Sequence, residues 1–228
     1  MKTINLLLFI IILSSASVFS QNFNTEKPDY KEIEKEISNE NSDFYYPKLM
    51  QKYLDSDTTM TLDEKRDLYY GYSFQKKYSP YGFSNFNDSV KTLFQKDKLN
   101  ENELITLIKF SDSILVENPF DLRALNHKAY AFKKLENRID YDKTINQMRI
   151  IFSALISSGD GLTKETAYYV ISVSHEYDLL NILGFEFGDS QSLIEHYDYL
   201  KLAKNSNKIK GLYFDVSPCL NSLDSMFK

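Results

Sequence analysis

The stretch SSGDGLTKETAYYVISV, residues 157–173, decides the fold of this chain. Before it, apolar residues recur three and four positions apart, the period of helices that bury one face. Within it, residues 168–173 alternate in the two-residue period typical of a strand. The glycines of Gly159-Asp160-Gly161 favour a turn with a positive φ between the two parts. We therefore predict an α+β fold, with a predominantly helical part at 29–158 and a sheet-containing part at 162–228.

Start and stop signals divide the helical part into separate helices. Thr61 and Glu64 have the spacing of a capping box, in which each side chain satisfies a backbone N–H of the other residue. Asn100 and Glu103 supply a second N-cap signal. Pro47 is tolerated only in the first turn of its helix, because proline has no backbone N–H to donate.

Residues 104–132 suggest how these helices pack. Asn118-Pro119 ends one helix and Asp121 can cap the next, which carries Ala129 three residues before Phe132. This order is similar to part of a tetratricopeptide repeat, although no 34-residue self-similarity recurs. We predict tetratricopeptide-like helix-hairpin packing with short loops between the helices.

The C-terminal part combines strands with short helices. Residues 196–202 and 212–216 alternate as strands around a polar turn at 204–208. Ser174 is expected to cap a short helix that Gly184 stops, and Ser217-Pro218 marks the start of a closing helix. The sequence therefore predicts a small antiparallel β-sheet with two short helices, joined to the helical part as a single domain over 29–228.

The first 20 residues have the layout of a secretory signal peptide. Lys2 precedes the unbroken apolar run of residues 6–13, and Val18 and Ser20 place small residues before a cleavage point near Ser20/Gln21. The run is much shorter than the roughly 20 residues that a membrane-spanning helix needs. We expect a periplasmic or secreted protein with a disordered polar start at 21–28, no membrane span and no lipid anchor.

Charge and cysteine content exclude several classes of protein. The net charge of −5 argues against nucleic acid as a partner, because neutralising phosphates needs clustered Lys and Arg. Cys219 is the only cysteine, so the chain cannot form an internal disulfide. It falls on the apolar stripe of the closing helix, and we predict a buried thiol.

The sequence contains no clear catalytic or metal-binding motif. His127 suits a packing or surface role. A metal site from His175, Glu176, His196 and Asp198 is conceivable, yet no local ligand motif is present. No nucleophile elbow or phosphate-binding loop occurs. We predict no catalytic residue, metal or cofactor and favour a non-enzyme, while a chemical role for His175, His196 and Cys219 stays open.

The aromatic segment at 69–86 is the strongest candidate for a binding surface. Tyrosine contributes much of the energy at protein interfaces, so Tyr70, Tyr78 and Tyr81 are candidates for contact with a partner. Packing between helices is the alternative interpretation. We predict a non-catalytic interaction or structural module of the cell envelope with a protein or glycan partner. The alternative is a glycan-binding or hydrolytic role.

Several short motifs together carry a resemblance to a known family. They are Phe44-Tyr45-Tyr46-Pro47-Lys48-Leu49-Met50, Asp57-Thr58-Thr59, Leu68-Tyr69-Tyr70-Gly71-Tyr72, Ser79-Pro80-Tyr81-Gly82, Gly159-Asp160-Gly161 with Glu165-Thr166-Ala167, Glu176-Tyr177 and Tyr213-Phe214. With these motifs the chain resembles an uncharacterised family of exported Bacteroidetes-type proteins, the domain of unknown function numbered 4919. The resemblance covers about 29–227. It implies one exported domain with no assigned activity and no catalytic residues to transfer.

Overall fold

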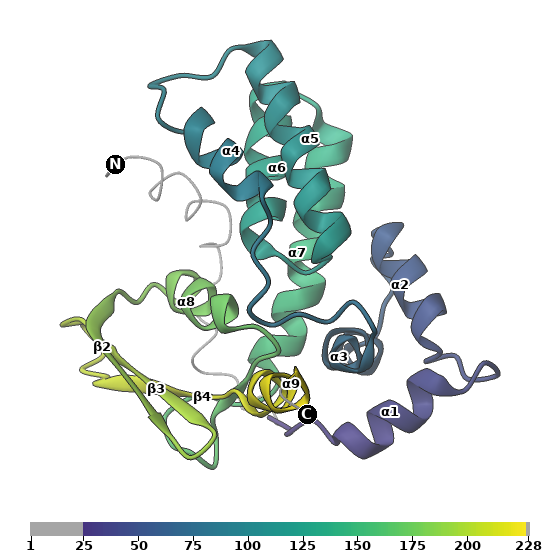
Figure 1. Ribbon diagram of the computed structural model, residues 1–228, viewed down its shortest axis with the longest axis vertical. Coiled ribbons are helices and arrows are strands. Elements are labelled where there is room, and N and C mark those ends of the chain that lie inside the picture. Colours follow the sequence, from purple (N-terminus) through teal and green to yellow (C-terminus); the bar gives the residue numbers. More distant parts are fainter. Residues whose placement is uncertain (1–24, 227–228) are drawn as a thin grey trace.

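The computed structural model describes residues 25–226, with side chains as far as Leu223. The predicted signal peptide and residues 21–24 lie outside the described residues. Figure 1 shows helices in the N-terminal part and a sheet in the C-terminal part, with α7 running between the two. The predicted α+β fold is confirmed.

The N-terminal helices begin where local capping signals place them. They are α1 (Tyr30–Ser38), α2 (Tyr46–Leu54) and α3 (Leu62–Gly71), and α3 continues into a 3₁₀ turn, η3 (Tyr72–Phe74). The predicted capping box of Thr61 and Glu64 is confirmed, since each side chain accepts a hydrogen bond from the other residue's backbone N–H. Pro47 occupies the first turn of α2, as predicted.

The remaining helices of this part pack on one another in chain order. They are α4 (Phe86–Leu93), α5 (Glu101–Glu117), α6 (Leu122–Lys134) and α7 (Arg138–Ile156). Asn100 and Glu103 form a capping box on α5, and Asp121 caps α6 through the backbone N–H of Ala124. Val90, Leu104 and other apolar residues of α4, α5 and α6 form a hydrophobic cluster of their own. The likeness to tetratricopeptide repeats stays a prediction.

The start of the described chain is held by side chains and backbone. The Glu26 N–H donates to the Ser157 carbonyl (2.9 Å), and the Arg66 guanidinium donates to the Glu26 carbonyl (2.8 Å). Pro28 is buried. Residues 25–28, which we predicted as part of a disordered start, therefore lie against the end of α7.

The turn at 159–161 joins the helical part to the sheet. Gly161 has a φ of +71°, which explains the glycine that the sequence places there. The Asp160 carboxylate accepts hydrogen bonds from the Leu162 N–H (2.9 Å) and the Thr166 hydroxyl. Thr166 in turn accepts from the Asp160 and Gly161 N–H groups through its carbonyl. The segment is thus a structural turn.

The sheet is mixed, which corrects the predicted antiparallel arrangement. Its strands are β1 (Tyr168–Tyr169), β2 (Phe187–Ile194), β3 (Tyr197–Leu202) and β4 (Gly211–Asp215), in the order β1-β4-β3-β2. The β2–β3 and β3–β4 pairs are antiparallel, but β1 pairs with β4 in parallel. The strand expected at 168–173 is also shorter, since it ends at Tyr169 and the chain enters a helix at Val173. Residues 167–172 are all buried, so the alternation in the sequence does not reflect one buried and one exposed face.

Two short helices accompany the sheet, as predicted. They are α8 (Val173–Ile182) and α9 (Ser217–Met226). The N-cap of α8 is Ser172 and not Ser174, and it makes no side-chain capping bond. Strand β2 had no sequence signal, because most of it is exposed and a register shift between Phe187 and Gln191 interrupts the alternation.

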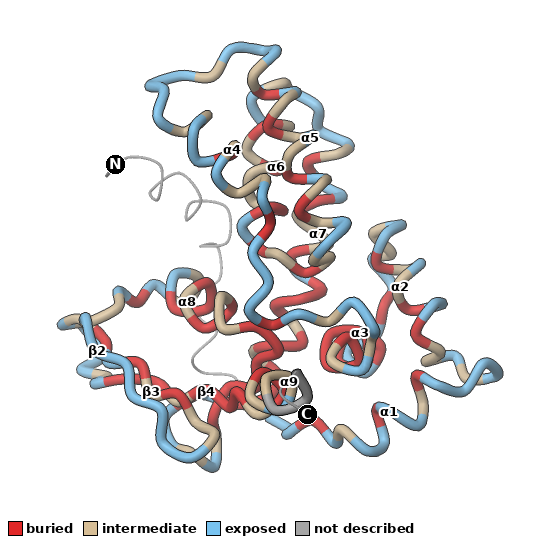
Figure 2. Tube along the Cα trace, viewed as in Figure 1, coloured by how far each residue is buried: buried red, intermediate tan, exposed pale blue. Residues whose placement is uncertain are grey.

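The main hydrophobic core lies where the helical part meets the sheet. It includes Leu68 of α3, Leu155 of α7, Leu200 of β3 and Phe214 of β4. Figure 2 shows buried backbone gathered around the ends of α3 and α7, next to β4 and α9. The turn at Gly159 therefore enters the densest part of the molecule.

Replacing Gly159 with Ala tests this turn. A Cβ atom there would lie 2.3 Å from the backbone carbonyl oxygens of Thr166 and Ala167, so the backbone must shift. We expect Gly159→Ala to lower the free energy of unfolding by about 3 kcal/mol, measured by urea denaturation.

Gly82→Ala is the matched control, because its new Cβ would lie 2.9 Å from the hydroxyl of exposed Ser79 and no closer than 3.1 Å to any backbone atom among its nearest neighbours. Its expected loss is less than about 1 kcal/mol. Equal losses in the two variants would contradict the assignment of Gly159 to a tight structural turn.

Candidate functional site

The three candidate tyrosines occupy different environments. Tyr70 has no exposed surface, and its hydroxyl donates to the Ala154 carbonyl (3.1 Å). Tyr78 is half-buried and donates to the Ile171 carbonyl (2.8 Å). Tyr81 is 44% exposed. The structure thus places Tyr70 in the core and leaves Tyr81 with the largest surface for a partner.

Residues 78–84, here named the aromatic loop, also expose a ring that sequence reasoning did not single out. Phe83 is 70% exposed, although it belongs to the aromatic segment seen in the sequence. The turn residues Pro80 and Gly82 directly before it, which indicate a loop, were the available signal. The loop therefore presents two large rings, Tyr81 and Phe83, within three positions.

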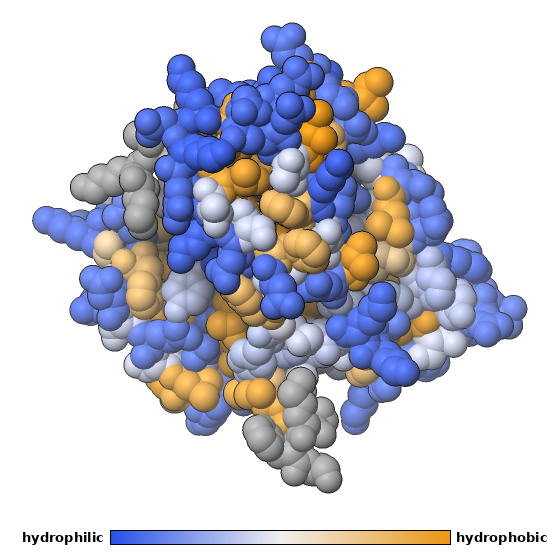
Figure 3. Space-filling model, turned by 45° about the horizontal axis from the view of Figure 1, so that its top comes forward, coloured by the Kyte–Doolittle hydropathy of each residue, from blue (hydrophilic) through white to orange (hydrophobic). Residues whose placement is uncertain are grey.

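Apart from Phe74, the other exposed large apolar side chains lie at least 16 residues from this loop in the sequence. On the face shown in Figure 3, apolar residues form separate patches among hydrophilic ones. Val116 (70%) and Ile139 (73%) are as exposed as Phe83. Single exposed apolar residues are normal on protein surfaces, so the pair of aromatic rings distinguishes the aromatic loop.

Two carboxyl groups lie buried close to the aromatic loop. Glu176 of α8 has no exposed surface, and neither of its carboxyl oxygens has a hydrogen bond of normal geometry within the described part of the chain. Burial, together with the nearby carboxylate of Asp198 on β3, raises the pKa of Glu176 to about 9. At neutral pH this residue is therefore an uncharged acid.

Asp198 connects this carboxyl pair to the surface. Its carboxylate accepts a hydrogen bond from the Gln191 amide (2.8 Å), and Gln191 accepts one from the Tyr177 hydroxyl. Burial raises the pKa of Asp198 as well. The pKa of Tyr81 is raised by burial and then by the electrostatic influence of Cys219, Asp198 and Glu176.

The residues of the conceivable metal site do not converge. Glu176 and Asp198 come together, but His175 turns the other way and bonds to Tyr69 and the Phe120 carbonyl. His196 pairs with the Asp215 carboxylate (3.4 Å). Among the described residues, no three His, Cys, Asp or Glu side chains lie where they could hold a metal ion together.

The remaining histidine is half-buried against an aromatic ring, and the cysteine is fully buried. The His127 ring lies 5.0 Å from the Phe94 ring, and burial lowers its pKa to about 4. Cys219 has no exposed surface, which confirms the predicted buried thiol. Burial raises the pKa of Cys219 to about 12, so the thiol is protonated and a poor nucleophile at neutral pH.

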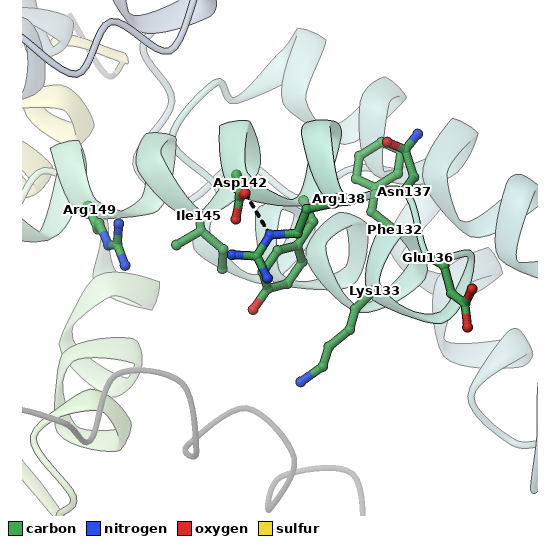
Figure 4. A pocket seen from close by; sticks show the side chains of 9 residues that line it. Phe132, Lys133, Glu136, Asn137, Arg138, Asp142, Ile145 and Arg149 are labelled. Carbon is green, nitrogen blue, oxygen red and sulfur yellow. Dashed lines mark hydrogen bonds and ion pairs between the residues drawn. The ribbon is translucent and has the colours of Figure 1, made fainter.

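One cavity of about 360 Å³ lies along the start of α7. Figure 4 shows its charged side chains spread along the helix, with Arg149 at one end and Glu136 at the other. The Arg138 guanidinium is already paired with the Asp142 carboxylate (2.7 Å). These groups do not converge on one point, so the cavity lacks the arrangement expected of a catalytic centre.

A second cavity, of about 420 Å³, lies between α1, the 3₁₀ turn and α9. Phe74, Gln75 and Tyr78 line one side, and Ser217 and Asn221 line the other. None of the described residues that line it is charged. Hydroxyl, amide and aromatic groups therefore determine what it can bind.

One comparison with known proteins identifies a family. The family model described as a domain of unknown function (DUF4919) matches residues 31–225. The chain belongs to the DUF4919 family. No curated protein and no solved structure matches this member of DUF4919. Among residues 25–226, no helix is both long enough and apolar enough to cross a bilayer.

Replacing Glu176 with Gln tests the buried acid. The raised pKa means that the folded state keeps a proton that the unfolded state loses above its ordinary pKa. Stability should therefore fall as pH rises between about 4.5 and about 9. Gln cannot ionise. The free energy of unfolding of Glu176→Gln should therefore rise, relative to that of wild type, by about 1 kcal/mol for each pH unit over that window. Urea denaturation at pH 5 to 8 measures this difference.

Glu186→Gln is the control, because Glu186 is exposed and lies a few residues beyond α8. Its stability should run parallel to that of wild type at every pH. If the Glu176→Gln curve also runs parallel to wild type, then Glu176 is ionised in the folded protein and the assignment is wrong.

Proposed function

We propose that this DUF4919 protein is an exported, non-catalytic interaction module that binds a protein partner through the aromatic loop. The observation that carries the proposal is the pair of exposed rings, Tyr81 and Phe83, on a loop whose base is anchored. Aromatic side chains contribute large contact areas at protein interfaces while losing little rotamer entropy.

The anchoring of the loop favours binding. The Tyr78 hydroxyl holds one end to Ile171, and the Ser172 hydroxyl donates to the Pro80 carbonyl (3.4 Å). The Gly82 N–H closes a turn on the Ser79 carbonyl (3.0 Å). Because the loop is ordered before binding, less conformational entropy is lost on association.

The carboxyl pair supports a partner with a basic side chain. After burial, Asp198 and Glu176 are among the groups that raise the pKa of Tyr81, and the pair carries a negative charge once either of them ionises. A lysine or arginine next to an apolar residue would place its aliphatic stem on the rings and its charge toward Asp198. The net charge of −5 favours the same kind of partner.

A catalytic role is less well supported by these groups. Glu176 has no exposed surface, so a substrate does not reach it in this conformation. The pKa of Cys219 is too high for a thiolate at neutral pH. We therefore favour binding over hydrolysis at this site.

Export is the second part of the proposal, and it follows from the leader at 1–20. A cleaved protein should begin at Gln21. Mass spectrometry of the protein recovered from the periplasmic or culture-medium fraction is expected to find this N-terminus. Recovery of chains that begin only at Met1 or Lys2 from the cytoplasm would contradict export.

Site-specific crosslinking tests the partner surface. The photoreactive residue benzoylphenylalanine is placed at Phe83 or, as a control of equal exposure, at Ile139 of the full chain in its native host. We expect a discrete adduct from position 83 and none from position 139. Tyr81→Ala in the position-83 variant should reduce the adduct roughly tenfold, since a central aromatic contact is lost.

The crosslinked peptide, identified by mass spectrometry, decides the nature of the partner. A peptide with Lys or Arg next to the crosslink supports the proposal. Adducts of equal yield at both positions, no adduct at position 83, or a lipid or glycan adduct would each overturn it.

A further inference from the structure

The cavity between α1, the 3₁₀ turn and α9 lies apart from the exposed rings of the aromatic loop and has its own chemistry. Its volume of about 420 Å³ is within the range of small-molecule sites. We propose that this cavity binds a neutral saccharide, an activity beyond the partner binding proposed for the aromatic loop.

Aromatic rings form the apolar walls of the cavity. Phe74 is 38% exposed, and its ring centroid lies 6.3 Å from that of Tyr30 at an interplanar angle of 62°. The ring of Tyr78 completes this side. The C–H groups on one face of a pyranose ring form an apolar surface that packs against such rings, and burying both surfaces stabilises the complex.

Polar groups with hydrogen-bonding capacity to spare complete the cavity. The exposed Asn221 side chain and the Ser217 hydroxyl make no hydrogen bond within the described part of the chain. The Gln75 amide donates to the Gly71 carbonyl (3.2 Å), which leaves its oxygen free to accept. Amide and hydroxyl groups both donate and accept, and so match the hydroxyls of a sugar.

The charge around the cavity indicates a neutral ligand. None of the described lining residues is charged. The N-terminus of α9 would favour an anion, but the buried Asp215 carboxylate already accepts the Ser217 N–H (2.9 Å) there. An acidic sugar would therefore find no cation among the described lining residues, and the Ser217 N–H at the start of α9 is already bonded.

Titration with defined oligosaccharides tests the inference. Chitotriose, cellotriose and maltotriose are added to the mature chain, residues 21–228, at up to about 10 mM, a range that detects weak binding. Side-chain amide signals of Gln75 and Asn221 in ¹⁵N NMR spectra should shift with at least one of these sugars. Phe74→Ala and Asn221→Ala should each raise the Kd roughly tenfold or more.

Matched variants separate this site from the aromatic loop. Phe83→Ala and Asn207→Ala alter an exposed ring and an exposed amide outside the cavity, and should leave the Kd unchanged. Melting temperatures check that Phe74→Ala still folds, and Asn221→Ala tests the same site without removing a packed ring. Failure of the sugar titration leaves the crosslink at position 83 unaffected, so the two proposals fail separately.

Three results would overturn the inference. The first is that none of the three sugars shifts the Gln75 or Asn221 signals. The second is that the shifts map to Tyr81 and Phe83, or that Phe83→Ala weakens binding as much as Phe74→Ala. The third is that trigalacturonate, an acidic sugar, binds more tightly than the neutral ones.

Discussion

The buried His175 side chain joins three segments that are far apart in the sequence. Its Nδ1 accepts a hydrogen bond from the Tyr69 hydroxyl (2.7 Å), and its Nε2–H donates to the Phe120 carbonyl (2.9 Å). Burial lowers the pKa of His175 to about 4, so the ring is neutral and one nitrogen donates while the other accepts. The Tyr69 oxygen then accepts the Ile171 N–H (3.3 Å). One hydrogen-bond network therefore joins helix α3, the α5–α6 connection and the segment before α8. Each donor in it has an acceptor.

This network also determines where the neighbouring acid lies. His175 and Glu176 are adjacent at the start of α8, so their side chains leave the helix about 100° apart. Because His175 faces Tyr69, Glu176 faces the sheet and meets Asp198. A buried acid without a good hydrogen bond costs stability, and the fold meets this cost by keeping Glu176 protonated at neutral pH.

Local signals in the sequence correctly predicted several helix caps and turns, because these depend on residues that are close in the sequence. The capping box of Thr61 and Glu64, the first-turn Pro47 and the turn before Gly161 each rest on contacts within a few positions. The antiparallel sheet was predicted too simply, because the parallel β1–β4 pair depends on residues far apart in the sequence. Strand β2 escaped prediction because most of its residues are exposed and its apolar residues, Phe187, Leu193 and Ile194, do not alternate with polar ones.

In the candidate site, too, local features were predictable from the sequence and contacts between distant residues were not. Composition identified the aromatic segment, but only the tertiary structure separates the buried Tyr70 from the exposed Tyr81 and Phe83. Equally, Glu176 and Asp198 were visible as conceivable ligands, while their pairing with each other and not with histidine depends on the direction in which α8 starts. Periodicity reports which residues are buried on average, and it carries no information about which buried groups meet.

Tyr78 links the two proposed binding surfaces physically. Its ring lines the cavity beside α9, and its hydroxyl holds the aromatic loop to Ile171. A saccharide that packs on this ring would restrict the same residue that anchors Tyr81 and Phe83. That residue and the loop are, however, already held by the Tyr78, Ser172 and Gly82 hydrogen bonds, so a first ligand has little entropy left to remove and the two affinities should be independent.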